Sequence, residues 1–412
     1  MTALGEAGVA DAAAPRAGWR AGTTLALCFA AALAEGYDIT SMGVAAPRLG
    51  PALALSREQL GPVFSASILG LFVGALLIGR LADRIGRKWT LVGSMAVFAG
   101  FSAATAFAHG FDDLIAIRVL AGAGLGGAMP NLIALAAEVV AEQRRALMVT
   151  VVASGMPFGG AVVSAVAAAP DWRAIFYVGG AAPFALALLM VPALSESPGV
   201  LRARSAPIAA AAARRDFGWV LLGEGRGPTS LLLWLGSFCS LMSLYLLLNW
   251  LPTLMAAKGI SRQGASLVAL LFNLGGGLGV LTLAALFDRG RRRAVLLSWY
   301  AGLVGALIAL AWVGASPIAA GAAGFAAGGF ICSAPIILYG LAPGYYRVAM
   351  RATGVGASVA VGRLGAIVGP LFAAALLSGG VGVTGLLLAL SPLAAMAGAA
   401  SLALLGRPTI SD

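Results

Sequence analysis

Glu35 and Asp38 stand inside an apolar stretch, residues 25–44, that is long enough to form a membrane-spanning helix. A charged side chain at the centre of a bilayer costs about 3 kcal/mol on insertion scales, so such residues mostly face a cavity or an opposite charge. Carboxylates at positions i and i+3 lie on the same face of a helix. The spacing therefore predicts two acids that address one pocket and carry protons along a substrate path.

Two arginines, Arg118 and Arg363, are also embedded in apolar stretches. The planar guanidinium group donates two parallel hydrogen bonds to a carboxylate. We expect Arg118 to pair with Asp38 or with a substrate carboxylate, the alternative being a static ion pair that braces two helices. Arg363 is expected to bind substrate, although Glu35 is an alternative partner for it.

Two embedded acids and two embedded bases leave a net charge near zero, which favours uptake of an anion together with a proton. A carrier acid needs a pKa near neutrality, which desolvation favours and a nearby arginine opposes. Asp38 is our first candidate for the proton carrier and Glu35 the second. A purely structural role for both acids remains the alternative.

Further polar and aromatic side chains inside apolar stretches predict a pocket that binds an aromatic ring and its substituents. The candidates are Tyr37, Tyr245, Asn249, Asn273, Trp250 and Tyr339. Trp250 fits equally well as an anchor at the membrane interface. His109, the single histidine, is expected in a loop and not in a proton relay.

The composition indicates an integral membrane protein. Of 412 residues, 60% are hydrophobic and 10% charged, and the mean hydropathy is +0.95, whereas charged residues make up about 25% of a typical soluble protein. Twelve stretches of about 20 apolar residues predict an all-α protein with twelve transmembrane helices. They are 21–45, 60–81, 89–108, 113–137, 147–168, 173–194, 229–254, 264–286, 294–314, 318–342, 353–378 and 384–405.

The net charge of +11 follows from topology and does not indicate a nucleic-acid partner. Most of the 27 Lys and Arg residues fall in alternate connections, and the opposite connections hold only Arg48, Arg57, Arg173, Lys258 and Arg262. This asymmetry places both termini in the cytoplasm. The predominance of Arg over Lys, with abundant Ala and Gly, suggests a GC-rich bacterium and its cytoplasmic membrane.

The longest hydrophilic interruption divides the chain into two six-helix halves. We expect a cytoplasmic tail (1–20), an N-terminal half (21–194), a central cytoplasmic loop (195–228), a C-terminal half (229–405) and a second tail (406–412). Residues 79–88 and 284–293 form a degenerate repeat between the halves. Two parallel repeats with a site between them are a known transporter architecture.

Several residues of this repeat and its surroundings are expected to control opening. Asp83 inside a basic run is unnecessary for topology, which favours a latch between helices over a plain positively charged loop. The predicted gating residues are Gly79, Asp83, Arg84, Gly86, Arg87, Glu138, Arg145, Asp288 and Arg351.

No constellation of nucleophiles or metal ligands stands out. Cys28, Cys239 and Cys332 lie in three separate apolar stretches with no ligand spacing. We expect no enzymatic activity, no cofactor and no metal, with a proton gradient as the energy source. We also expect the lipid bilayer as surroundings and function as a monomer.

Residues 79–88, Gly-Arg-Leu-Ala-Asp-Arg-Ile-Gly-Arg-Lys, and Arg118 with the following Gly122, Gly124, Gly126 and Gly127 resemble the loop 2–3 and helix-4 signatures of the major facilitator superfamily. The resemblance spans the whole chain. It implies the fold of two six-helix halves and transport by alternating access.

Within that superfamily, the sequence is similar to the aromatic acid:H⁺ symporter family. The similarity lies in the acidic-Gly-x-Asp element at 35–38, in Asn-Trp-Leu-Pro at 249–252 and in residues 351–366. Glu35 in place of the usual Asp resembles the branch that transports 3-(3-hydroxyphenyl)propionate. The resemblance implies import of that acid, a hydroxybenzoate or benzoate with H⁺, and roles in transport for Glu35, Asp38, Arg118 and Arg363. A facilitator or a drug/H⁺ antiporter for another small compound is the alternative.

Overall fold

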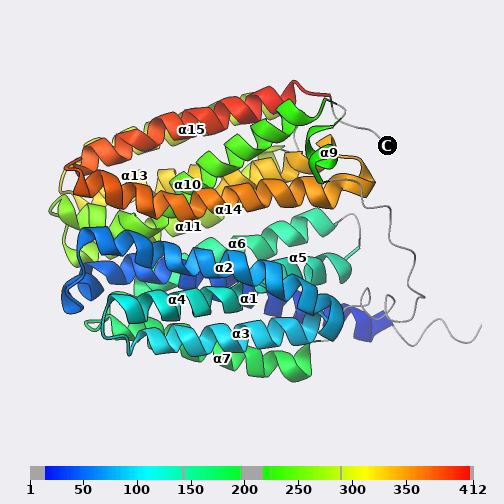
Figure 1. Cartoon of the computed structure of the whole chain (residues 1–412), viewed down its shortest axis with the longest axis horizontal. Coiled ribbons are helices and arrows are strands. Elements are labelled where there is room, and N and C mark those ends of the chain that lie inside the picture. The colour runs from blue at the N-terminus through cyan, green and yellow to red at the C-terminus, as the bar shows by residue number, and fades with distance from the viewer. Residues whose placement is uncertain are drawn as a thin grey trace, which may run out of the picture.

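The computed structural model consists of helices that run back and forth along one direction (Figure 1). It describes residues 14–141, 144–194, 196, 217–223, 225–287 and 290–408. Within those ranges, ten helices are long and apolar enough to cross a membrane. The helix α3 and the consecutive helices α4 and α5 supply the remaining two of the twelve predicted spans.

The described residues of the first half form seven α-helices. They are α1 (Ala14–Ala52), α2 (Arg57–Ile85), α3 (Arg87–Thr105), α4 (Phe111–Leu125), α5 (Ala128–Glu138), α6 (Arg145–Val166) and α7 (Arg173–Ala193). Helix α1 begins within the tail that we predicted for residues 1–20. The single helix predicted over 113–137 is interrupted between α4 and α5, where Gly126 and Gly127 lower helix propensity.

The second half repeats this order after the short helix α9 (Phe217–Leu222). Its segments are α10 (Gly227–Ala257), α11 (Arg262–Phe287), α12 (Arg292–Trp312), α13 (Pro317–Leu341), the 3₁₀ turn η2 (Ala342–Tyr345), α14 (Val348–Ser378) and α15 (Val383–Leu405). The start of α1, helix α9 and the end of α15 lie at the same end of the bundle, on the right in Figure 1. We call it the terminal end, and the opposite one the far end.

The two halves use the same helix pairings. In the first half α1 packs on α6, α2 on α4 and α3 on α7; in the second, α10 packs on α14, α11 on α13 and α12 on α15. This correspondence matches α3 with α12, α5 with the end of α13, and α7 with α15. It gives the sequence repeat between residues 79–88 and 284–293 a structural counterpart.

Contacts between the halves lie in the middle of the bundle and toward the far end. Phe64 of α2 meets Trp250 of α10 edge to face, with ring centroids 5.3 Å apart. The Ser65 hydroxyl donates to the Ile367 carbonyl of α14 at 2.8 Å. Nearer the middle, Pro157 of α6 lies against Gly276 of α11. These contacts close the far end of the boundary between the halves.

Glycines allow α1 and α6 to approach each other at backbone distance. A Cβ atom added to Gly159 would lie 1.9 Å from the Leu33 carbonyl oxygen, and one added to Gly36 would lie 1.8 Å from the Met156 carbonyl oxygen. Small residues at such crossings are the usual means of close helix packing in membranes. This packing fixes the face of α1 that carries Glu35 and Asp38.

We expect Gly159→Ala to destabilise the protein by about 3 kcal/mol, because the added methyl group meets backbone that cannot yield. Gly22→Ala is the matched control, since nothing lies within 4 Å of a Cβ atom at Gly22 in the same pair of helices. Thermal unfolding of the purified proteins in detergent measures the difference. Equal melting temperatures for the two variants would contradict the packing argument.

Candidate substrate and proton site

Asp38 and Arg118 form a fully buried ion pair within the first half. The two guanidinium nitrogens Nη1 and Nη2 of Arg118 donate to Oδ1 and Oδ2 of Asp38 at 2.7 and 2.8 Å. Asp38 is 0% exposed and Arg118 1% exposed. The Ser102 hydroxyl of α3 makes a longer bond of 3.4 Å to the same carboxylate. The predicted pairing of Arg118 with Asp38 is thus present in this conformation.

Glu35 lies one helical turn away on α1 in a different environment. It is 2% exposed, and its Oε2 atom is buried without a hydrogen-bond partner among the described residues. It interacts electrostatically with the opposite charge of Arg363 on α14. The guanidinium Nη1 of Arg363 is likewise buried without a partner among those residues. A buried acceptor and a buried donor therefore face the boundary between the halves with bonding capacity unused.

Two tyrosines of the second half share this environment. Tyr245 of α10 interacts electrostatically with Arg363, Glu35 and Tyr339, and Tyr339 of α13 interacts with Arg363. Both tyrosines and Arg363 are partly exposed. Tyr245 and Arg363 lie near the middle of α10 and α14, and Tyr339 lies in the last turn of α13. We call Glu35, Tyr245, Tyr339 and Arg363 the interhalf cluster. It combines a carboxyl group, a guanidinium group and two phenols contributed by both halves.

Asn273 lies on α11 at the contact between the halves. Its side-chain nitrogen donates to the Ala269 carbonyl at 2.9 Å, whereas its Oδ1 atom is buried without a partner among the described residues. A Cβ atom on Gly160 of α6 would lie 2.1 Å from that oxygen. Asn273 thus presents an unused acceptor beside α6, as a group that reads a hydroxyl donor requires.

The other predicted pocket residues are placed differently. The Tyr37 hydroxyl donates to the Ile175 carbonyl of α7 at 2.8 Å, which directs it into the first half and away from the interhalf cluster. Asn249 lines a small cavity of about 10 Å³ beside Arg118. Trp250 is buried at 0% exposure and donates to the Pro370 carbonyl, so it is part of the closed far end and not an interface anchor. His109 is exposed in a loop, as predicted.

The predicted gating residues are only partly described. Arg87, at the start of α3, forms an ion pair with Glu138 at the end of α5. The Arg351 Nε atom donates to the Pro343 carbonyl at 3.1 Å. Gly86 adopts φ 103°, a conformation that favours glycine. Asp288 and the side chains of Asp83, Arg84 and Arg145 lie outside the described residues, and Gly79 lies in the last turns of α2.

The sequence did not predict the two serines that support the ion pair. Ser102 bonds to Asp38, and Ser67 of α2 donates to the Arg118 carbonyl at 3.3 Å. No spacing rule singles out a serine in an apolar helix, because serine is frequent there and often bonds its own backbone. Only the helix arrangement identifies these two.

The sequence matches the Major Facilitator Superfamily over residues 28–252. It is 41% identical to the 3-(3-hydroxy-phenyl)propionate transporter of Escherichia coli (strain K12), over 93% of this chain and 94% of that protein. It is 36% identical to the gallate transporter of Pseudomonas putida, over 87% and 86%. It is 35% identical to the 4-hydroxybenzoate transporter of Pseudomonas putida, over 92% and 90%.

Solved structures share the fold. The D-xylose-proton symporter superposes with a TM-score of 0.71 at 16% identity, covering 93% of this chain and 96% of that one. A bacterial homologue of the human lysosomal transporter Spinster, in an inward-facing conformation, gives a TM-score of 0.72 at 18% identity, over 96% and 99%. The relatives named above are transporters and not enzymes. The two-half arrangement of helices, the embedded ion pair and these matches together assign the chain to the major facilitator superfamily.

Proposed function

We propose that this protein is a secondary active transporter that imports an aromatic carboxylate together with H⁺ by alternating access. The candidate substrates are 3-(3-hydroxyphenyl)propionate, a hydroxybenzoate and benzoate. The observation that carries the proposal is the unused hydrogen-bonding capacity of Glu35 and Arg363 across the boundary between the halves. The names of the relatives, which transport hydroxyphenylpropionate, gallate and 4-hydroxybenzoate, support the same class of substrate.

Arg363 is the residue proposed to bind the substrate carboxylate. Its guanidinium has a buried donor without a partner, and a carboxylate accepts such donors in pairs. Tyr245 and Tyr339 lie within electrostatic range of Arg363 and supply phenol rings that suit an aromatic ring in the same space. Arg118 supports binding indirectly in this conformation, because both of its terminal nitrogens are engaged by Asp38.

Asn273 is proposed to accept a hydrogen bond from a ring hydroxyl. Asn273→Leu is expected to weaken transport of a hydroxylated substrate by about tenfold, the equivalent of a hydrogen bond of about 1.4 kcal/mol. Uptake of benzoate, which has no ring hydroxyl, should change less than threefold. The ratio of kcat/KM for 3-hydroxybenzoate and benzoate measures this preference. An unchanged ratio would exclude Asn273 from hydroxyl recognition.

Proton coupling is assigned to Asp38 and Glu35. The embedded charges Glu35, Asp38, Arg118 and Arg363 balance when both acids are ionised, so an entering carboxylate adds one negative charge to a low-dielectric region. Binding of one proton to a helix-1 acid restores neutrality and lowers the cost of moving the loaded site across the membrane. The net process is uptake of the carboxylate and a proton together.

We propose that both termini lie in the cytoplasm of a bacterial cell and that the far end of the bundle faces outward. The protein is proposed to function as a monomer. The contacts of Phe64 with Trp250 and of Ser65 with Ile367 then close the outer side. Opening on the cytoplasmic side is proposed to be controlled by the ion pair of Arg87 with Glu138. The other gating residues proposed on that side are Asp83, Arg84, Arg145, Asp288 and Arg351.

Uptake of labelled 3-(3-hydroxyphenyl)propionate into proteoliposomes tests the proposal. Accumulation is expected when the interior is alkaline, and it should collapse when an uncoupler abolishes the pH gradient. Equilibration without accumulation, insensitive to the uncoupler, would indicate a facilitator. Proton-driven extrusion of the compound would indicate an antiporter. Either result would replace the symport assignment.

A further inference from the structure

The two halves differ at the terminal end of the bundle, where the helix that follows the repeated motif begins. Arg87 and Lys88 begin α3, and at the corresponding repeat positions Arg292 and Arg293 begin α12. At both helix starts the first backbone N–H groups have no acceptor within the helix, and the start carries the positive end of a helix dipole. The chemistry at the first start is visible in the contacts of its own half.

In the first half, two carboxylates of the chain occupy this position. The Glu196 carboxylate, just beyond α7, accepts hydrogen bonds from the backbone N–H groups of Arg87 and Lys88 at 2.8 and 3.2 Å. Glu138, the last residue of α5, forms the ion pair with the Arg87 guanidinium. The start of α3 is therefore an anion site whose anions are supplied internally.

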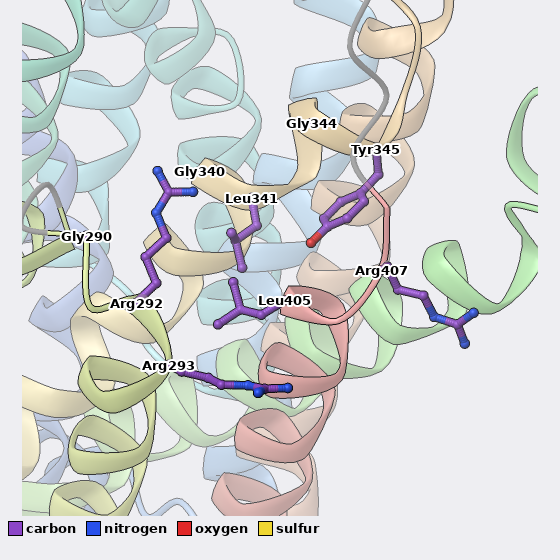
Figure 2. A pocket seen from close by; sticks show the side chains of 9 residues that line it. All are labelled: Gly290, Arg292, Arg293, Gly340, Leu341, Gly344, Tyr345, Leu405 and Arg407. Carbon is purple, nitrogen blue, oxygen red and sulfur yellow. The ribbon is translucent and has the colours of Figure 1, made fainter.

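In the second half, a cavity of about 520 Å³ lies at the matching position (Figure 2). It is lined by Gly290, Arg292, Arg293, Gly340, Leu341, Gly344, Tyr345, Leu405 and Arg407. Three of these nine residues are arginines and none is acidic. Helix α13 ends at Leu341, whereas its counterpart α5 ends at Glu138. Arg407 lies just beyond α15, whereas Glu196 lies just beyond the counterpart helix α7.

The lining is suited to a ligand with an anionic group and an apolar portion. Figure 2 shows Arg292 and Arg293 extending to different sides of the cavity, with Leu341 and Leu405 between them and Arg407 directed away. Both arginines at the start of α12 are exposed. The Tyr345 hydroxyl donates to the Leu404 carbonyl, and the Arg292 guanidinium lies over the Phe287 ring, 5.8 Å from its centroid.

We propose that the start of α12, with Arg292 and Arg293, binds a phosphate group: that of an anionic membrane phospholipid, or a free phosphate. The cavity lies among α12, α13 and α15, all of the second half, and none of its lining residues belongs to the interhalf cluster. Basic pockets between transmembrane helices on the cytoplasmic side are suited to anionic headgroups. The leucines between the arginines offer contact to the carbon atoms of a lipid, which free phosphate does not have.

The test uses the full-length protein purified in detergent. Native mass spectrometry after exposure to mixed micelles measures how much phosphatidylglycerol is retained relative to phosphatidylcholine. The protein with Arg292→Gln and Arg293→Gln should lose preference for phosphatidylglycerol by about thirtyfold, the effect of two arginines near a membrane surface. Arg291→Gln is the control for each of the two single substitutions, because it removes one positive charge at the same surface from a residue that does not line the cavity.

A second arm separates the two sources of phosphate. Inorganic phosphate is added against chloride of equal ionic strength, and thermal unfolding and lipid retention are both measured. Retained phosphatidylglycerol that phosphate does not displace supports the lipid, whereas a higher melting temperature and displacement of the lipid support free phosphate. The proposal is overturned if the original protein has no such preference and no response to phosphate. It is equally overturned if the double variant behaves like Arg291→Gln.

Discussion

Asp38→Asn is expected to abolish accumulation of the aromatic acid, with a loss of uptake of about 100-fold or more. The two carboxylate oxygens of Asp38 accept both terminal nitrogens of Arg118 at a site with almost no solvent exposure. An asparagine offers one acceptor and turns two donors toward a guanidinium. Leaving one buried charge unpaired in this way costs on the order of 3–5 kcal/mol. Uptake by proteoliposomes and thermal unfolding in detergent measure the two consequences.

A second variant separates the proton-carrying role of Asp38 from its structural role. The double substitution Asp38→Asn with Arg118→Gln removes both charges, so much of the stability lost in the single variant should return. Accumulation against a gradient should remain absent, because no acid is left at this position to bind a proton. The carrier assignment to Asp38 fails if the double variant accumulates substrate as the original protein does. Asp113→Asn, at an exposed carboxylate, is the matched control.

Arg363→Gln is expected to raise the KM for an aromatic carboxylate by about 100-fold, since hydrogen bonds to a charged group contribute about 1.5–3 kcal/mol. The KM of Arg363→Lys should lie between that of the original protein and that of Arg363→Gln, because lysine keeps the charge and loses the planar pair of donors. Arg363→Gln should also abolish the preference for the acid over its uncharged amide as a competitor. Concentration dependence of uptake and competition by both compounds measure these effects.

Arg262→Gln provides the control for Arg363→Gln, because Arg262 is exposed at the start of α11, at the far end of the bundle. Its KM should stay within about twofold of the original value. If Arg363→Gln lowers only the amount of folded protein and leaves KM and the preference for the acid unchanged, Arg363 braces the helices and the carboxylate binds elsewhere.

The fold was predictable from the sequence because the bilayer leaves few alternatives. Backbone groups in hydrocarbon must bond within their own segment, so each apolar stretch predicts a helix. The exception is instructive. Residues 113–137 were predicted as one helix, yet α4 ends at Leu125, because the run of glycines that permits close packing also weakens the helix.

The site was predictable only where charge made a residue costly. Glu35, Asp38, Arg118 and Arg363 were identified because an ionisable group in an apolar helix needs a partner, and Arg118 does pair with Asp38. Tyr37 shows the limit of this reasoning. Its neighbours in sequence include the candidate site residues Glu35 and Asp38, but a helix turns by 100° per residue, and the Tyr37 hydroxyl bonds to α7. Spacing identified the helix and not the direction of the side chain.

The placement of the two acids relative to the boundary between the halves has a consequence for energy conversion. Asp38 and Arg118 belong to α1 and α4 of one half and stay at a fixed separation when the halves tilt as rigid bodies. Glu35 and Arg363 belong to α1 and α14 of different halves, so tilting changes the distance between them. The movement itself thereby alters the electrostatic potential at Glu35. If Glu35 carries the proton in the symport proposed above, its affinity for a proton and the tilt of the halves depend on each other, and the proton gradient is thereby coupled to the movement.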